Sequence, residues 1–255
     1  MAKIHTRTFR VRWSELDANG RFAPENYLRY LIETAYDWGD SLDLGSAAYE
    51  QLGIYWLIRE TGVEIFATPA HNDVVDLTIW MVHWQKVRGN RCFEVILPAT
   101  GEVLARGCQK IVVMDRVSNR PTALEESFIG SFRLEQPRSF DLPAYSYNPT
   151  SEPAHQWHKV VEWQDLDAQN HVNNAVYLSF ARQAIADMLS KQGESDGLAP
   201  TPSFFQMQYS QPALWGDLLM VSIHEETNPD GRPYFIAKIT RQESGETIAD
   251  GVLVY

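Results

Sequence analysis

The clearest structural signal in the chain is "WQDLDAQNHVNNAVYLSF" (163–180), which sets acid, base and amide side chains directly before an amphipathic run. A shift of 150 residues places "WSELDANGRFAPENYLRY" (13–30) on it without a gap, with identical residues at six of eighteen positions. The match resumes further on, where "TGEVLARG" (100–107) aligns with "SGETIADG" (244–251). Such self-similarity predicts an internal duplication.

Each copy predicts the same elements in the same order: an extended run, a polar loop, one helix and several strands. Pro24 suits the first turn of the first helix, and apolar residues follow at helical spacing: Tyr27, Leu28, Leu31, Ile32, Ala35 and Trp38. The second helix repeats this pattern at Val176, Tyr177, Phe180, Ala184, Met188 and Leu189. Strands are expected at 62–67, 73–84, 91–98 and 102–115, with Gly101 in a hairpin turn. We predict an α+β fold in which an antiparallel sheet wraps a long helix.

The duplication divides the chain into an N-terminal unit (1–129), a linker (130–154) and a C-terminal unit (155–255). The linker has no sustained periodicity and contains four prolines. With 255 residues, of which 44% are hydrophobic, the chain is long enough and apolar enough to bury two cores.

The composition argues against several classes of protein. The net charge of −11 predicts no general attraction to nucleic acid or to an anionic membrane. Residues 1–150 hold 16 basic and 19 acidic side chains, whereas residues 151–255 hold 6 and 14, so a polyanionic partner would favour the first half. The first residues contain no apolar core of signal-peptide length, and no run approaches a membrane span, which predicts a cytoplasmic protein.

The cysteine and histidine spacing predicts no metal or redox chemistry. Cys92 and Cys108 lie on two runs joined by a short turn, so we expect them to be neighbours across a hairpin, as buried and inert thiols. The histidines show no ligand spacing. We therefore expect neither a metal nor a cofactor.

The D-x-x-x-H-V-N-N-x-x-Y loop (167–177), between a strand and a helix wrapped by a sheet, resembles the hotdog fold, and the duplication resembles a tandem double hotdog. Together with "WLIRETGVEIFATPAHNDVVDLTIW" (56–80) and "TGEVLARGCQKIVVMDRVSNRP" (100–121), it makes the chain similar to the acyl-ACP thioesterases of bacteria and plant plastids. The resemblance implies a thiolester hydrolase of fatty acid biosynthesis and lipid metabolism. Its substrate would be acyl-ACP, and its products free fatty acid and carrier thiol.

The same resemblance implies catalytic groups in the second copy. The family carries an Asp, an amide residue and a His in this loop, which correspond to Asp167, Gln169 and His171. The plant enzymes usually have Asn in place of Gln169, and after a later strand they carry an acidic residue and a Cys where this chain has Pro212 and Ala213. A mechanism that requires those two groups cannot be carried over.

The first copy offers a secondary set of residues. Its loop keeps Asp17 and Asn19 but has Arg21 at the position of the histidine, a pattern that also resembles the Asp-dependent loop of single-hotdog acyl-CoA thioesterases. Asp17 is therefore a reserve candidate, and whether this loop is active stays open.

The chemistry of thioester hydrolysis suits these groups. Asp167 precedes a helix N-terminus, whose dipole favours a carboxylate, and it can act as a base toward water or as a nucleophile. His171 can polarise the carbonyl or protonate the leaving thiol, and Gln169 can hold water or the carbonyl. Free N–H groups from Asn173 to Val176 are candidate oxyanion donors. Asn173 or Asn174 is also the expected N-cap, and the other predicted substrate-binding residues are Tyr27, Leu31, Trp38 and Trp56.

Several alternatives remain open at this stage. The substrate can be an acyl-CoA instead of acyl-ACP, and the chain length follows from no single residue. A hotdog hydratase or dehydratase acting on enoyl thioesters is a second hypothesis, and a non-catalytic acyl-thioester-binding protein is a third. The basic residues in 84–91 and 105–110 offer a site for an acidic carrier protein or form a solvated strand face. The protein is expected to be a monomer or a homodimer.

Overall fold

The structure is a computed structural model that describes residues 4–132, 138–193 and 199–255. It divides into two compact units. The first contains Met1–Leu16 and Tyr27–Leu142, and the second contains Asp17–Asn26 and Pro143–Tyr255. The polar loop of the first copy therefore belongs to the second unit.

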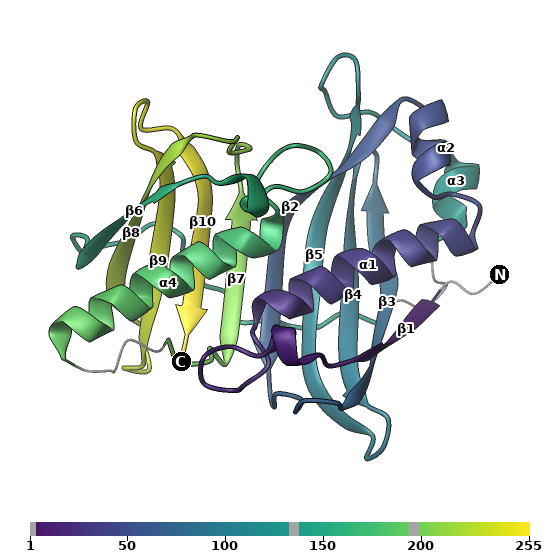
Figure 1. The fold of residues 1–255 in the computed structure, drawn as a ribbon. Helices are drawn as coiled ribbons and strands as arrows, with labels where there is room; N and C mark the ends of the chain where they lie inside the picture. The colour runs from purple at the N-terminus through teal and green to yellow at the C-terminus, as the bar shows by residue number, and fades with distance from the viewer. Residues whose placement is uncertain (1–3, 133–137, 194–198) are drawn as a thin grey trace. The chain divides into compact units, whose positions relative to one another are not determined.

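The first unit is an antiparallel sheet crossed by one long helix (Figure 1). Its strands run in the order β1-β3-β4-β5-β2, and each pairs antiparallel with its neighbours. Figure 1 shows α1 lying across β2, β5, β4 and β3. The elements are β1 (Ile4–Arg10), η1 (Trp13–Glu15), α1 (Glu25–Ser41), α2 (Ser46–Gln51), β2 (Ile54–Ile65), β3 (Val74–Gln85), β4 (Arg88–Leu97), β5 (Glu102–Asp115) and α3 (Glu126–Gly130).

The second unit repeats this arrangement. Its strands run in the order β6-β8-β9-β10-β7, again antiparallel throughout, and α4 crosses the sheet (Figure 1). The elements are β6 (His155–Val160), η2 (Trp163–Asp165), α4 (Asn174–Gln192), β7 (Phe204–Tyr209), β8 (Leu218–Thr227), β9 (Pro233–Arg241) and β10 (Thr247–Val254).

The two orders are the same when each strand is replaced by its counterpart in the other copy. The first strand, β1 or β6, lies at one end of its sheet, and the third, fourth, fifth and second strands follow. The predicted fold is therefore confirmed as α+β, with two tandem hotdog units that each wrap a sheet around a long helix.

The predicted hairpin at Gly101 is confirmed. Gly101 adopts a φ of 75°, which glycine tolerates without a Cβ clash, and its N–H donates to Leu97 O. This turn places Cys92 directly opposite Cys108 on the adjacent strand, with their Cα atoms 4.0 Å apart. The prediction of two inert thiols is wrong, because the structure joins them in a disulfide.

The predicted linker packs against described residues on both sides of the unit boundary. Its residues 133–137 lie outside the described ranges. In the first unit, the Arg138 carbonyl accepts from Trp80 Nε1 at 2.7 Å, and the Arg138 guanidinium lies 4.5 Å from that ring. In the second unit, the Tyr145 ring packs against Phe204, with ring centroids 5.6 Å apart.

Candidate active site

The loop before α4 is a tight turn closed by backbone hydrogen bonds. Asp167 N–H donates to His171 O at 2.9 Å, and Asn170 N–H donates to Asp167 O at 3.0 Å. Asn170 adopts a φ of 61°, a left-handed conformation that asparagine accepts more readily than most residues. The Asp167 carboxylate accepts the Gln169 N–H at 2.8 Å, which fixes the carboxylate in the turn.

The turn brings the three predicted catalytic side chains together. His171 Nδ1 lies 3.6 Å from Asp167 Oδ2, which is too long for a hydrogen bond but within ion-pair range. His171 Nε2 lies 3.3 Å from Gln169 Oε1. The Asp167 and His171 side chains are 25% and 30% exposed, so a ligand can reach both.

The start of α4 is capped by Asn173, as predicted. Asn173 Oδ1 accepts the Ala175 N–H at 2.9 Å, and Asn173 O accepts the Val176 N–H at 2.8 Å. The Asn173 N–H donates to Asp165 O. The N–H groups of Asn173, Ala175 and Val176, which were predicted to be free, are therefore occupied. Among the residues that the structure describes, only the Asn174 N–H of this set has no acceptor.

A second segment, around Ala213, holds this loop from the other side. Ala213 O accepts the Val172 N–H at 2.9 Å, and the Ala213 N–H donates to the Tyr177 hydroxyl at 3.0 Å. Burial, above all, raises the Tyr177 pKa to about 12, and the charge of Asp167 adds to the rise. Helical spacing predicts Tyr177 only as an apolar residue of the second helix and gives no contact with the Ala213 segment. Its place at the end of the D-x-x-x-H-V-N-N-x-x-Y pattern is the sequence feature that could have indicated a position near the loop.

The loop of the first copy has the same turn but a different carboxylate environment. Asp17 Oδ1 accepts the N–H groups of Asn19 and Arg21, and Asp17 Oδ2 accepts from Arg182 Nη2 at 3.0 Å. Arg182, on α4, also binds Glu25 at 3.0 and 3.1 Å. Arg182 and Glu25 are buried and Asp17 is nearly so, with side-chain exposures of 8%, 7% and 11%.

This buried cluster holds Asp17 in an ion pair. Burial by itself lowers the Arg182 pKa, but the charge of Glu25 and the hydrogen bonds that Arg182 donates to both carboxylates outweigh this effect, so the pKa is raised. The other two members of the secondary set are exposed, and Asn19 Nδ2 donates to Ala199 O at 2.9 Å. The second-copy carboxylate faces an imidazole, whereas the first-copy carboxylate is neutralised by a guanidinium.

The predicted substrate-binding residues of the first unit are mostly core residues. Tyr27 and Leu31 are fully buried on α1, and Trp38 is 2% exposed. Trp56, on β2, is half-buried between the rings of Trp84 and Tyr49, at 5.7 and 6.1 Å. These placements suit an apolar interior and do not by themselves define a substrate tunnel.

A further carboxylate lies just before the loop. Asp165 is 8% exposed and accepts the Glu162 N–H at 2.8 Å. Lys159 Nζ lies 3.1 Å from the same carboxylate oxygen. Asp165 therefore stabilises the short turn that leads into the loop. No cluster of metal-ligating side chains occurs within the described ranges.

Two hotdog units in one chain, with an Asp, Gln and His turn before the helix of the second, define a double-hotdog protein. The chain belongs to the acyl-ACP thioesterase family. The family's "Acyl-ACP thioesterase N-terminal domain" matches residues 2–132, and its "Acyl-ACP thioesterase C-terminal domain" matches residues 149–248.

Individual relatives support this assignment at low identity. The palmitoyl-acyl carrier protein thioesterase of Gossypium hirsutum is 23% identical over 199 residues, which cover 69% of this chain and 46% of that protein. An oleoyl-acyl carrier protein thioesterase of Arabidopsis thaliana is 23% identical over 193 residues, which cover 69% of this chain and 53% of that protein. Both are chloroplastic. The chain spans about half the length of these curated relatives.

Solved structures show the same fold. The 12:0-ACP thioesterase from Umbellularia californica superposes with a TM-score of 0.82 at 18% identity, covering 99% of this chain and 94% of that one. An acyl-ACP thioesterase from Bacteroides thetaiotaomicron gives a TM-score of 0.76 at 18% identity, covering 100% and 99%. Both units of the fold are therefore shared with these proteins.

Proposed function

We propose that this protein hydrolyses fatty acyl-ACP to free fatty acid and carrier thiol. The observation that carries the proposal is the convergence of Asp167, Gln169 and His171 on one turn that ligands can reach. Family membership and the names of the relatives point to the same substrate class. Acyl-CoA is the alternative thioester. We place the reaction in fatty acid biosynthesis in the cytoplasm, with the chain acting as a monomer or a homodimer.

Asp167 is the proposed base. A water molecule held by its carboxylate would attack the thioester carbonyl carbon while Asp167 takes one proton from that water. The carbonyl oxygen then carries negative charge, and the N–H of Asn174 at the positive end of α4 is the proposed donor to it. Loss of one such donor typically raises the barrier by about 3–4 kcal/mol.

His171 is the proposed acid for the second step. As the tetrahedral intermediate collapses, the carbon–sulfur bond breaks, and the imidazole supplies the proton that the leaving thiolate takes up. Gln169 lies within reach of Nε2 and is the proposed group that orients the ring. Direct attack by Asp167, which would form an anhydride, uses the same three residues.

Thiol release from purified protein tests this function. Asp167→Asn and His171→Ala should each lower kcat on acyl-ACP by about 10²- to 10⁴-fold, the usual contribution of a general acid or base. His158→Ala is the matched control, since His158 is an exposed histidine of β6 that contacts Gln242. The proposal fails if the wild-type protein releases no thiol from acyl-ACP or acyl-CoA of any chain length. Tight retention of acyl-CoA without turnover would indicate a binding protein instead.

A further inference from the structure

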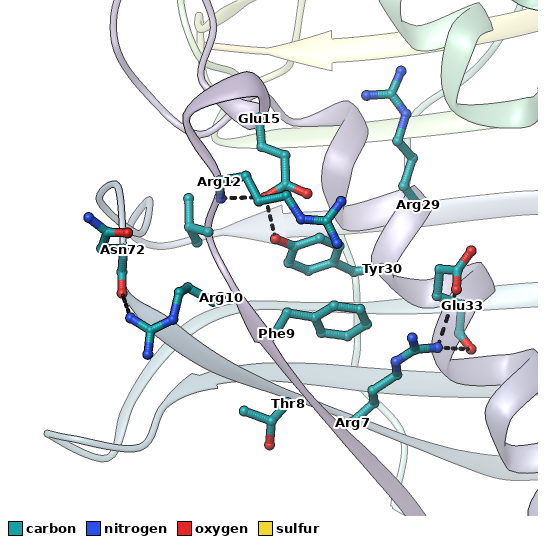
Figure 2. Close-up of a pocket in the computed structure, with 11 residues that line it drawn as sticks. Arg7, Thr8, Phe9, Arg10, Arg12, Glu15, Arg29, Tyr30, Glu33 and Asn72 are labelled. Atoms are coloured by element: carbon teal, nitrogen blue, oxygen red, sulfur yellow. Dashed lines mark hydrogen bonds and ion pairs between the residues drawn. The ribbon is translucent and has the colours of Figure 1, made fainter.

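The inner face of the first sheet, which α1 covers, is defined at β1. Figure 2 shows the Phe9 ring of β1 beside Tyr30 of α1, and the two rings stack with centroids 4.0 Å apart. His5, on the same strand, pairs with Asp37 of α1 at 2.9 Å. Because successive side chains of a strand point to opposite faces, the odd-numbered residues of β1 point toward the helix.

Strand pairing extends this inner face to Arg91 of β4. His5 lies opposite Ile79 of β3, and Ile79 lies opposite Phe93 of β4. Arg91 comes two residues before Phe93, so it points to the same side of the sheet. A cationic side chain on this face needs an explanation, since charged groups avoid the core face of a sheet unless they are paired.

Arg91 begins a hydrogen-bonded row of three polar side chains. It lies opposite Gln109 of β5, which in turn lies opposite Thr61 of β2. Arg91 Nε donates to Gln109 Oε1 at 2.7 Å, and Gln109 Nε2 donates to Thr61 Oγ1 at 2.9 Å. Gln109 and Thr61 are 2% and 1% exposed. These two buried groups hold the guanidinium in one orientation.

No carboxylate pairs with Arg91 among the residues that the structure describes. Its ionisable neighbours are two phenols, Tyr49 and Tyr36, and burial, above all, lowers the Arg91 pKa to about 10, so the side chain stays positive at neutral pH. The terminal Nη groups have no acceptor within the described ranges, and they are not fully enclosed. A guanidinium has five N–H donors and no acceptor. Arg91 therefore offers donors that a ligand can reach.

The second unit fills the equivalent positions with apolar side chains. Gly107 of β5 and Gly251 of β10 occupy matching places in the two copies, and they lie opposite Phe93 and Ala237. Two residues along each strand from these pairs, the polar row has three apolar counterparts: Phe235 for Arg91, Leu253 for Gln109 and Phe205 for Thr61. Replacement of buried ionic groups by well-packed apolar ones is often neutral or stabilising. The hotdog unit therefore does not require a polar row here, which favours a role in binding.

We propose that Arg91, oriented by Gln109, binds an oxygen-bearing group on the acyl chain, so that the protein favours acyl thioesters that carry a hydroxyl or carboxyl group on the chain. The inference rests on the proposed function and on the predicted acyl contact Trp56, whose ring lies 6.1 Å from that of Tyr49. Both groups supply the acceptor that the guanidinium lacks, and a carboxylate also pairs with its charge. An unsubstituted alkyl chain would instead cover the cation without pairing it, which is unfavourable.

Matched substrates test this preference. Acyl-ACPs of equal length, unsubstituted or with a hydroxyl or carboxyl group at successive positions of the chain, are compared by kcat/KM. Wild type should favour at least one oxygenated chain by about tenfold or more, as a hydrogen bond to a charged group implies. Arg91→Met should abolish this preference, whereas the control Arg88→Met, at an exposed arginine of the same strand, should keep it. The hydroxyl and carboxyl series identify which of the two groups the site takes.

A binding measurement separates this site from the proposed function. In acyl pantetheine amides a nitrogen replaces the thioester sulfur, so calorimetry gives Kd without turnover. The oxygenated amide should bind wild type about tenfold tighter than the unsubstituted one, and Arg91→Met should bind both equally. This difference in a protein that hydrolyses no thioester would remove the function and keep the site. Equal kcat/KM and equal Kd for all chains in wild type would mean that Arg91 binds water only and would overturn the proposal, as would a preference that persists in Arg91→Met.

Discussion

The exchange of His171 for Arg21 accompanies a change in the partner of the loop aspartate. Both loops form the same turn, in which the N–H of the aspartate donates to a carbonyl four residues later and the aspartate side chain caps the turn. In the second copy the residue at that fourth position is His171, whereas in the first copy it is Arg21. The aspartates then differ in their partners, an imidazole for Asp167 and the buried Arg182 for Asp17.

We predict that Asp17 stabilises the fold and takes no part in turnover. Arg182→Met would leave two buried carboxylates without a cation and should lower the free energy of unfolding by about 3–5 kcal/mol. Asp17→Asn keeps the Arg182–Glu25 pair and should cost less, about 1–3 kcal/mol, with kcat unchanged. Urea unfolding and thiol release measure the two effects, with the exposed neighbour variant Gln183→Met as control. Loss of turnover in a stable Asp17→Asn protein would contradict this assignment.

The residues of the candidate site were predictable from the sequence because the turn is local. Asp167, Gln169 and His171 lie within five residues, and the hydrogen bonds that bring them together join residues of the same turn. The burial of Asp165 and the bond between Tyr177 and Ala213 were not predictable. Each depends on chain segments that approach only after the sheet has formed.

At the scale of elements, the hairpins followed from pattern and turn chemistry. The strands predicted at 73–84, 91–98 and 102–115 correspond closely to β3, β4 and β5. The strand predicted at 62–67 overlaps only the last four residues of β2, which runs from Ile54 to Ile65, and extends two residues beyond it. The first half of β2 has mixed burial without a clean alternation, so periodicity gave no clear signal there.

The hairpin of β4 and β5 gives a redox prediction. Oxidised protein should contain the Cys92–Cys108 disulfide, and reduction should lower its free energy of unfolding by about 2–4 kcal/mol, since the bond closes a short loop in the unfolded chain. Urea unfolding with and without reductant measures this, together with the intact mass of the chain. In a reducing cytoplasm the pair is expected to be dithiol. The Cys92→Ala/Cys108→Ala variant should be insensitive to reductant, and air-oxidised protein that keeps two thiols would contradict the pairing.

At the scale of the whole molecule, duplication is visible in contacts as well as in strand order. His5 pairs with Asp37 at 2.9 Å in the first unit, and His155 pairs with Asp187 at 2.8 Å in the second. Both pairs join the first strand of a unit to its long helix. The tryptophans that match in sequence, Trp13 and Trp163, are 74% and 79% exposed, so their identity does not reflect core packing.

The chain between the repeats is anchored by a carboxylate that should respond to acid. The Glu226 carboxylate accepts hydrogen bonds from Thr150 and Ser151, of which the one from the Thr150 hydroxyl has the largest effect. Together these hydrogen bonds lower the Glu226 pKa from its ordinary value of 4.5 to about 2. Because the folded pKa is the lower one, the stabilisation is complete above pH 4.5 and is lost as the pH falls toward about 2.

Thermal unfolding of Glu226→Gln against wild type tests this anchor. The variant should have the lower Tm near neutral pH, and the difference should shrink as the pH falls below 4.5. Glu243→Gln, at an exposed position between β9 and β10, is the control and should show no such pH-dependent difference. A Tm difference that stays constant between neutral pH and the acid limit of folding would contradict the anchoring role.

The sequence by itself determined the duplication, the order of elements in each copy and the loop that carries the candidate catalytic groups, because these depend on local turns and on the spacing of apolar residues. Tertiary structure alone decided that residues 17–26 belong to the second unit and that Arg182 neutralises Asp17. These features join residues far apart in the chain, and the pairing of distant charges leaves no periodic trace in a sequence.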